Sequence, residues 1–139
     1  MSPVVARIVT CSYRAYRREF GTAVRITLGV PRWIRLPNPA YTERESWLSV
    51  PQLAPRRDYF RAADDVFNTR YLDQLERLAD EVDQALDAIP PEHGAICLCC
   101  FEQQVTGPGM CHRRLASAWL AERYCIEIPE MDPAPTGCK

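Results

Sequence analysis

The feature that most constrains the fold is the run Ala95–Cys100, which is apolar at all six positions. Successive residues of a strand point to opposite faces, so a strand of this composition is buried on both sides. Strands covered on both faces are typical of parallel sheets flanked by helices. The run therefore predicts a central strand of an α/β domain.

Helical patterns on both sides of this run predict the same fold. Across 72–89, apolar residues recur at three- and four-residue steps with charged residues between them, which predicts one amphipathic helix. Pro90 and Pro91 end it, because proline cannot continue a helix. A further helix is expected over 111–124, beginning at position 111 or 112.

The N-terminal part predicts two more strands, over 4–10 and 23–28, from their β-branched residues and flanking breakers. The segment 36–55 contains four prolines and is expected to be a long irregular connection. Helical structure is expected to resume near position 56 or 57, and a short last strand is expected over 126–128.

These elements predict one small α/β domain over 1–129, followed by a loose tail over 130–139. The expected architecture is a mostly parallel sheet flanked by helices, a Rossmann-like three-layer arrangement. Ligands of such sheets bind beyond the carboxyl ends of the strands.

Cysteine usage points to a reducing, cytoplasmic location. The chain has seven cysteines, at 11, 97, 99, 100, 111, 125 and 138, and three of them crowd into four positions. A disulfide framework spaces its cysteines to join distant loops, so we expect these thiols to be free or metal-bound. No apolar run is long enough to cross a bilayer, so we expect no membrane association.

The net charge of −1 conceals an asymmetry. Residues 1–61 carry eleven arginines and four acidic residues, whereas residues 62–139 carry six basic and fourteen acidic residues. A basic half can attract phosphate groups or nucleic acid. The alternative is that the two halves pair with each other across the fold.

The residues that could carry chemistry gather around the expected helix start at 111. This start follows a loop containing Gly107 and Gly109, and the unpaired N–H groups of a helix start favour anions. Arg113 is the candidate anion ligand; ion pairing with nearby acidic residues is the alternative. Cys111 is the candidate nucleophile, and a small packed residue is the alternative.

Four other residues complete this predicted site. His112 is a candidate base for Cys111, and Glu102 is a candidate general acid or base or a partner of the basic residues. Ser12 follows the first early strand, at the edge where parallel strands end, and Arg25 lies within the second; both are expected to support anion binding.

A metal site is the competing interpretation of the same segment. Cys97, Cys100, Cys111 and His112 offer soft ligands for zinc or an iron–sulfur cluster. However, Cys97 and Cys99 share one face of the strand while Cys100 takes the other, and no C-x-x-C pair is present. We therefore expect no metal or other cofactor, and keep this ligand set as the alternative.

The late segment resembles domain of unknown function 488, a bacterial, archaeal and phage family. The family typically has a strand ending in Cys-x-Glu, matched by Cys100 to Glu102, and then Cys-His-Arg opening a helix, matched by residues 111–113. Residues 23–25 with Pro31 resemble its early Val-Arg…Pro element, and residues 71–72 also fit.

The chain departs from the family pattern in two places. Ala23 stands where Asp is common, and Cys11-Ser12 ends the first strand where Gly-His-Ser is typical. The resemblance covers about the last 70 residues most clearly. It implies a small α/β fold with a Cys/Glu/His/Arg pocket and no defined reaction.

Three hypotheses follow. The first is a pocket that binds or processes a small phosphate-bearing ligand, such as a nucleotide, or nucleic acid. The second is a cysteine and histidine module for metal binding or redox chemistry. The third is a non-catalytic domain that binds nucleic acid or protein through the basic N-terminal half. The sequence does not decide whether the chain is an enzyme.

Overall fold

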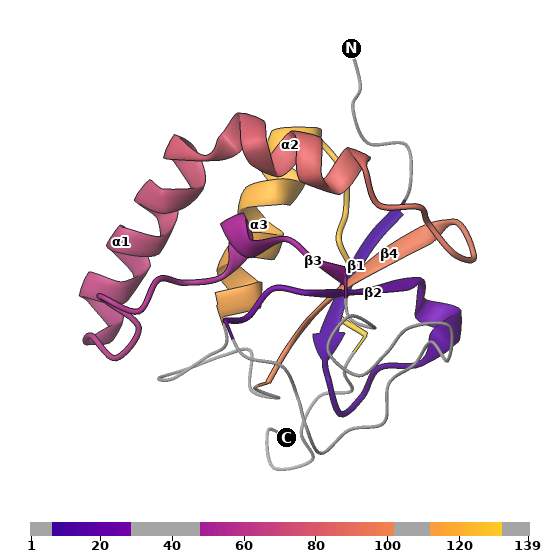
Figure 1. Cartoon of the computed structure of the whole chain (residues 1–139), viewed down its shortest axis with the longest axis horizontal. Coiled ribbons are helices and arrows are strands. Elements are labelled where there is room, and N and C mark those ends of the chain that lie inside the picture. The colour runs from indigo at the N-terminus through magenta and orange to yellow at the C-terminus, as the bar shows by residue number, and fades with distance from the viewer. Residues whose placement is uncertain (1–6, 29–47, 102–111, 132–139) are drawn as a thin grey trace.

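The computed structural model describes residues 7–28, 48–101 and 112–131. Within them a four-stranded sheet forms the centre of the domain (Figure 1). The strands are β1 (Arg7–Ser12), β2 (Thr22–Arg25), β3 (Leu48–Ser49) and β4 (Ala95–Cys100). Their order is β1-β4-β2-β3 and every pair is parallel, which confirms the predicted α/β fold class.

Three α-helices lie on one side of this sheet (Figure 1). They are α1 (Asp64–Arg77), α2 (Ala79–Asp87) and α3 (His112–Tyr124). The structure also has two short 3-10 helices, η1 (Arg18–Phe20) after β1 and η2 (Pro51–Leu53) after β3. Among the described residues, no helix combines the length and the apolarity that a membrane span needs.

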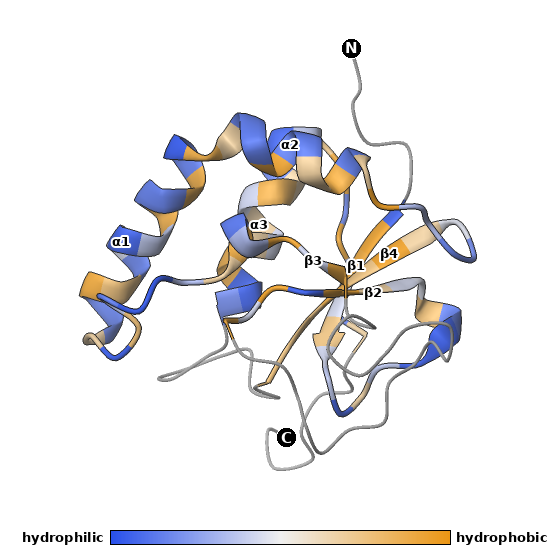
Figure 2. Cartoon of the chain, in the orientation of Figure 1, coloured by the Kyte–Doolittle hydropathy of each residue, from blue (hydrophilic) through white to orange (hydrophobic). Residues whose placement is uncertain are grey.

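The sheet separates two apolar clusters. The larger one joins Ile8, Ile96 and Leu98 of the strands to buried side chains of all three helices. The smaller one lies on the opposite face, where residues of β1 and β4 are covered by side chains from the segment 13–20 and by Met131. β4 is central and buried at all six positions, as its sequence predicts. In Figure 2 this strand has colours from the hydrophobic half of the scale.

The prediction of one continuous helix over 72–89 is wrong, because this stretch is divided between α1 and α2. Leu78 leaves helical geometry at φ −104° and ψ 15°, so α1 ends before it and α2 begins after it. The break lets Leu75 of α1 and Leu86 of α2 reach the same cluster. The helix also begins at Asp64, not near 56 or 57, because turns occupy residues 57–61.

The two ends of the sheet also differ from the prediction. β3 forms within the stretch expected to be irregular, and pairs Leu48 with Val24. No strand forms over 126–128; instead the next residues attach to β1. The N–H of Thr10 donates to the carbonyl of Pro129 at 3.0 Å, and the N–H of Met131 donates to the carbonyl of Thr10 at 2.7 Å. The first two residues of the expected tail are therefore bound to the sheet edge.

Candidate functional site

Three cysteines meet on the face of the sheet opposite the helices. β1 and β4 pair with Cys11 opposite Cys99 and Val9 opposite Cys97. Side chains alternate along a strand, so Cys97 and Cys99 point to one face, and pairing in register places Cys11 on that face too. We call Cys11, Cys97 and Cys99 the cysteine triad.

The sulfurs of the triad are in mutual contact. The Sγ of Cys11 lies 3.4 Å from that of Cys97 and 4.0 Å from that of Cys99, and the last two sulfurs are 3.9 Å apart. All three residues are fully buried. Among the described residues, this is the group of cysteine, histidine and acidic side chains whose ligand atoms are close enough to share one ion.

The size of this triangle matches the coordination of a metal by thiolates. A point equidistant from three atoms at these separations lies about 2.2 Å from each sulfur. A Zn–S bond is about 2.3 Å long, so a bound ion sits just outside the plane of the sulfurs. The three side chains are therefore preorganised, and an ion of this size needs little movement of the strands.

Hydrogen bonding within the triad lowers the pKa of one of its cysteines and, together with burial, raises the pKa values of the other two. Hydrogen bonds from Cys97 and Cys99 lower the pKa of Cys11, against the opposing effects of burial and of the Glu130 carboxylate. The hydrogen bond to Cys11 is the main cause that raises the pKa of Cys97, whereas burial is the main cause for Cys99. Cys11 is thus the most acidic of the three, because its neighbours stabilise its charge.

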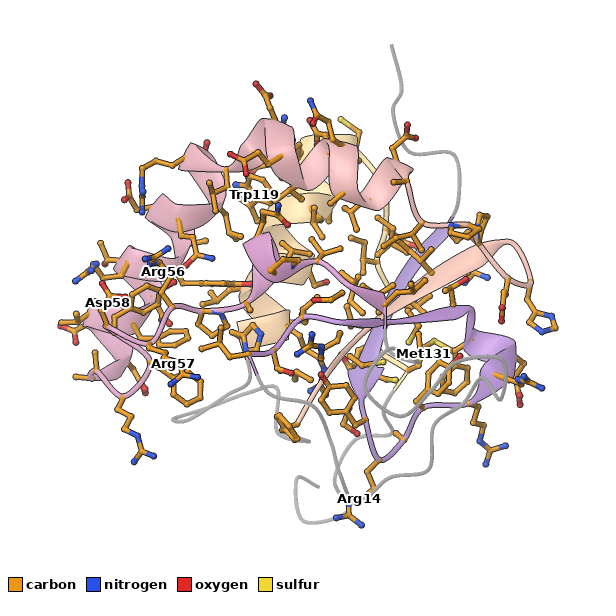
Figure 3. The ribbon with its side chains drawn as sticks, in the orientation of Figure 1. Arg14, Arg56, Arg57, Asp58, Trp119 and Met131 are labelled. Atoms are coloured by element: carbon orange, nitrogen blue, oxygen red, sulfur yellow. The ribbon has the colours of Figure 1, made fainter. Side chains whose placement is uncertain are left out.

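The surroundings of the triad are apolar. Val9, Ala23 and Tyr13 belong to the same buried cluster, and Tyr16, Phe20, Phe101 and Met131 pack against it. Met131 is labelled in Figure 3. The hydroxyl of Tyr16 donates to the carbonyl of Gly21 at 2.6 Å, so it is directed to the backbone. Burial is the main cause that raises the pKa of Tyr16, which indicates that the region disfavours added negative charge.

Arg113, the predicted anion ligand, is fully buried and engaged with protein groups. Its Nε and Nη2 donate to the two carboxylate oxygens of Glu130 at 3.0 and 2.9 Å, and its Nη1 donates to the Sγ of Cys100 at 2.9 Å. Glu130 also accepts a hydrogen bond from the hydroxyl of Thr10 at 2.7 Å. The alternative interpretation, an ion pair with a nearby acidic residue, describes this arrangement.

His112 is buried beside the helices rather than turned toward the triad. Its Nε2 lies 2.7 Å from the carbonyl of Ile26, which only accepts, so Nε2 donates. Tyr71 packs edge-on against its ring. Burial is the main cause that lowers the pKa of His112 to about 4, so the ring is neutral near pH 7.

The other predicted anion ligands lie at the carboxyl ends of their strands. The Oγ of Ser12 accepts from the N–H of Ala15 at 3.2 Å. Arg25 donates from Nη1 to the carbonyl of Leu28 at 3.2 Å. Ser12 pairs with Cys100, and Arg25 pairs with Cys99, so the expected convergence of these strand ends is present. Glu102 and Cys111 lie outside the described residues.

The alternative metal set is not brought together. Cys97 belongs to the triad, on the face of the sheet opposite the helices. Cys100 and His112 lie on the helix side, and Cys111 lies outside the described residues. Cys100 is disulfide-bonded, which corrects the expectation that all thiols are free or metal-bound. Spacing along the chain could not show this, because the fold decides which sulfurs meet.

Sequence reasoning assigned no chemical role to Cys11. The signal that could have found it is the spacing of residues on two paired strands. Val9 and Cys11 share one face of β1, as Cys97 and Cys99 share one face of β4. Only the neighbour relationship of these strands, 86 residues apart at the Cys11–Cys97 contact, turns this pattern into a cluster.

Comparisons with known proteins give no relative from which to transfer a role. No protein family, curated protein or solved structure matches the chain.

Proposed function

We propose that this protein binds a thiophilic ion through the sulfurs of Cys11, Cys97 and Cys99. The observation that carries the proposal is the triangle of buried sulfurs, whose dimensions suit metal–thiolate bonds. Of the three hypotheses, this is the metal-binding one. Its ligand set keeps Cys97 from the predicted set but does not include Cys100 or His112.

Charge explains why an ion belongs with these groups. Three buried thiolates without a counterion would repel one another and lose their hydration, so the unliganded triad retains protons. A bound cation displaces those protons and compensates the charge, which links binding to pH and to folding. This function requires reduced thiols at the triad, and Cys11, Cys97 and Cys99 are free, whereas Cys100 is disulfide-bonded.

An ion must reach the triad through the cover on its face of the sheet. The segment 129–131 is held to β1 by the two backbone hydrogen bonds at Thr10 and by the Thr10–Glu130 contact. Met131 is half-buried against the cluster. An ion therefore reaches the triad only when this cover opens locally.

The test is titration of the full-length reduced protein with Co²⁺ and Cd²⁺, followed by thiolate-to-metal charge-transfer absorption. We expect one ion per chain. Alanine or serine at Cys11, Cys97 or Cys99 should abolish the signal, while Cys125→Ser, at an exposed cysteine, should retain it. Circular dichroism checks that each variant is folded. A signal equal in folded triad variants, or the absence of triad-dependent binding of any thiophilic ion, would overturn the proposal.

The hypothesis of a phosphate-bearing ligand or nucleic acid remains a prediction, as does the resemblance to domain of unknown function 488. With Arg113 bonded to Glu130, a phosphate at that guanidinium would have to displace a carboxylate that is already bidentate.

A further inference from the structure

We infer that the ion class of the cysteine triad is a trivalent metalloid, arsenite or its antimony analogue, held by three sulfur bonds. The inference rests on the proposed function, and it deepens it by naming the ligand. Two properties of the site carry it: the number of ligand atoms that converge, and the apolar character of the described side chains around them.

The first property is the coordination number. Within the described ranges, no fourth cysteine, histidine or acidic side chain comes within ligand distance of the three sulfurs. The neighbouring Tyr16 hydroxyl is directed to Gly21, and that of Tyr13 to Thr27. Zn²⁺ at structural sites takes four ligands in a tetrahedron. A trivalent metalloid carries a lone pair and completes its bonding with three sulfurs, so it matches the ligand atoms present.

The second property is the net charge of the complex. Three thiolates with a divalent ion leave one negative charge, and with a monovalent ion they leave two. The charge of Arg113 acts on Cys11, but Arg113 is itself paired with the carboxylate of Glu130. An uncompensated charge among Val9, Ala23 and Phe20 is costly. Three thiolates with a trivalent centre are neutral, so this complex suits the cluster.

The bonding step balances without any oxidant or reductant. Neutral arsenous acid, As(OH)₃, reacts with three Cys–SH groups to give As(S–Cys)₃ and three water molecules. Three As–O bonds break and three As–S bonds form, and each thiol proton leaves with a hydroxide as water. Arsenic stays trivalent throughout. The incoming molecule is itself uncharged, so it can cross the apolar cover during a local opening.

The experiment is a titration of the full-length reduced protein with arsenite, read by native mass spectrometry. We expect a gain of one arsenic atom with the loss of three hydrogens. The control Cys125→Ser should behave identically. A single substitution to Ser or Ala within the triad leaves two thiols, so we expect affinity to fall by more than about tenfold, with the product retaining a hydroxyl on arsenic.

Two further probes separate the possible failures. Phenylarsine oxide accepts only two sulfurs, so binding as tight as that of arsenite would show a dithiol site and overturn the inference. If Co²⁺ or Cd²⁺ binds in a triad-dependent way but arsenite does not, the inference is wrong while the proposed function stands. If neither arsenite nor these metals depends on the triad in folded variants, both fail.

Discussion

The guanidinium of Arg113 is bonded to Glu130 through two nitrogens, and through Glu130 it reaches Thr10 of β1. The arginine side chain is fully buried, whereas the glutamate side chain is 22% exposed. This pair joins the first turn of α3 to the segment that covers the edge of β1. A residue at the start of a predicted loose tail therefore compensates the charge of the largest fully buried side chain.

Glu130→Gln should destabilise the fold strongly. It leaves the buried guanidinium without its counter-charge, and breaking such a pair costs about 3 kcal/mol. Urea unfolding measures the change. Glu127→Gln removes an exposed carboxylate nearby and should stay within about 0.5 kcal/mol of wild type. Equal losses in the two variants would contradict the structural role of the pair.

Acid should destabilise the protein through His112. Its pKa is about 4 in the folded state against 6.5 for the ordinary group, so protons bind the unfolded chain first. The contribution of His112 is complete above pH 6.5 and is lost as the pH falls toward 4, by up to about 3 kcal/mol.

The measurement is the free energy of unfolding across that pH window. His112→Gln preserves a donor for the carbonyl of Ile26 and does not titrate, so its profile should be flatter. His93→Asn is the matched control, because His93 is exposed and its φ of 53° suits asparagine. A His112→Gln profile as steep as that of wild type would refute the assignment.

The free cysteines should differ sharply in reactivity. Cys11, Cys97 and Cys99 are buried, and Cys125 is exposed. In the native protein we expect iodoacetamide to modify Cys125 first, with the triad protected until urea unfolds the chain. Peptide mapping by mass spectrometry reads the order. Modification of the triad as fast as that of Cys125 would show that the cluster is open to solvent.

Gly21 should tolerate no side chain. A Cβ there would lie 2.5 Å from the carbonyl oxygen of Ala95, in the backbone of β4, and the φ of 126° is itself unfavourable. We expect Gly21→Ala to cost more than about 3 kcal/mol. Gly94→Ala is the matched control: its φ is 75° but nothing lies within 4 Å, so only about 1 kcal/mol is expected. Thermal or urea unfolding compares them, and equal costs would contradict the close contact.

The sequence predicted the elements that have strong periodic patterns. The run Ala95–Cys100 is the buried central strand, and the helix over 112–124 begins as expected. Alternation along a strand also assigned Cys97 and Cys99 to one face and Cys100 to the other. These features are local, because they depend only on the repeat of a strand or a helix.

The bend at Leu78 and the strand β3 could not be predicted in the same way. Residues 72–89 have one continuous helical repeat, and the break appears only because two helix segments must pack on one sheet face. β3 has two residues, too short for a periodic signal, and exists because Leu48 meets an open edge of β2.

The sequence by itself determined the α/β class, the buried strand and the presence of thiols, imidazole and guanidinium around it. Tertiary structure decided which of them meet. Parallel pairing of β1 with β4 joins Cys11 to Cys97 and Cys99, and docking of residues 129–131 pairs Glu130 with Arg113. The physical reason is that strand order and register follow from packing free energy over the whole domain, which no local pattern of residues contains.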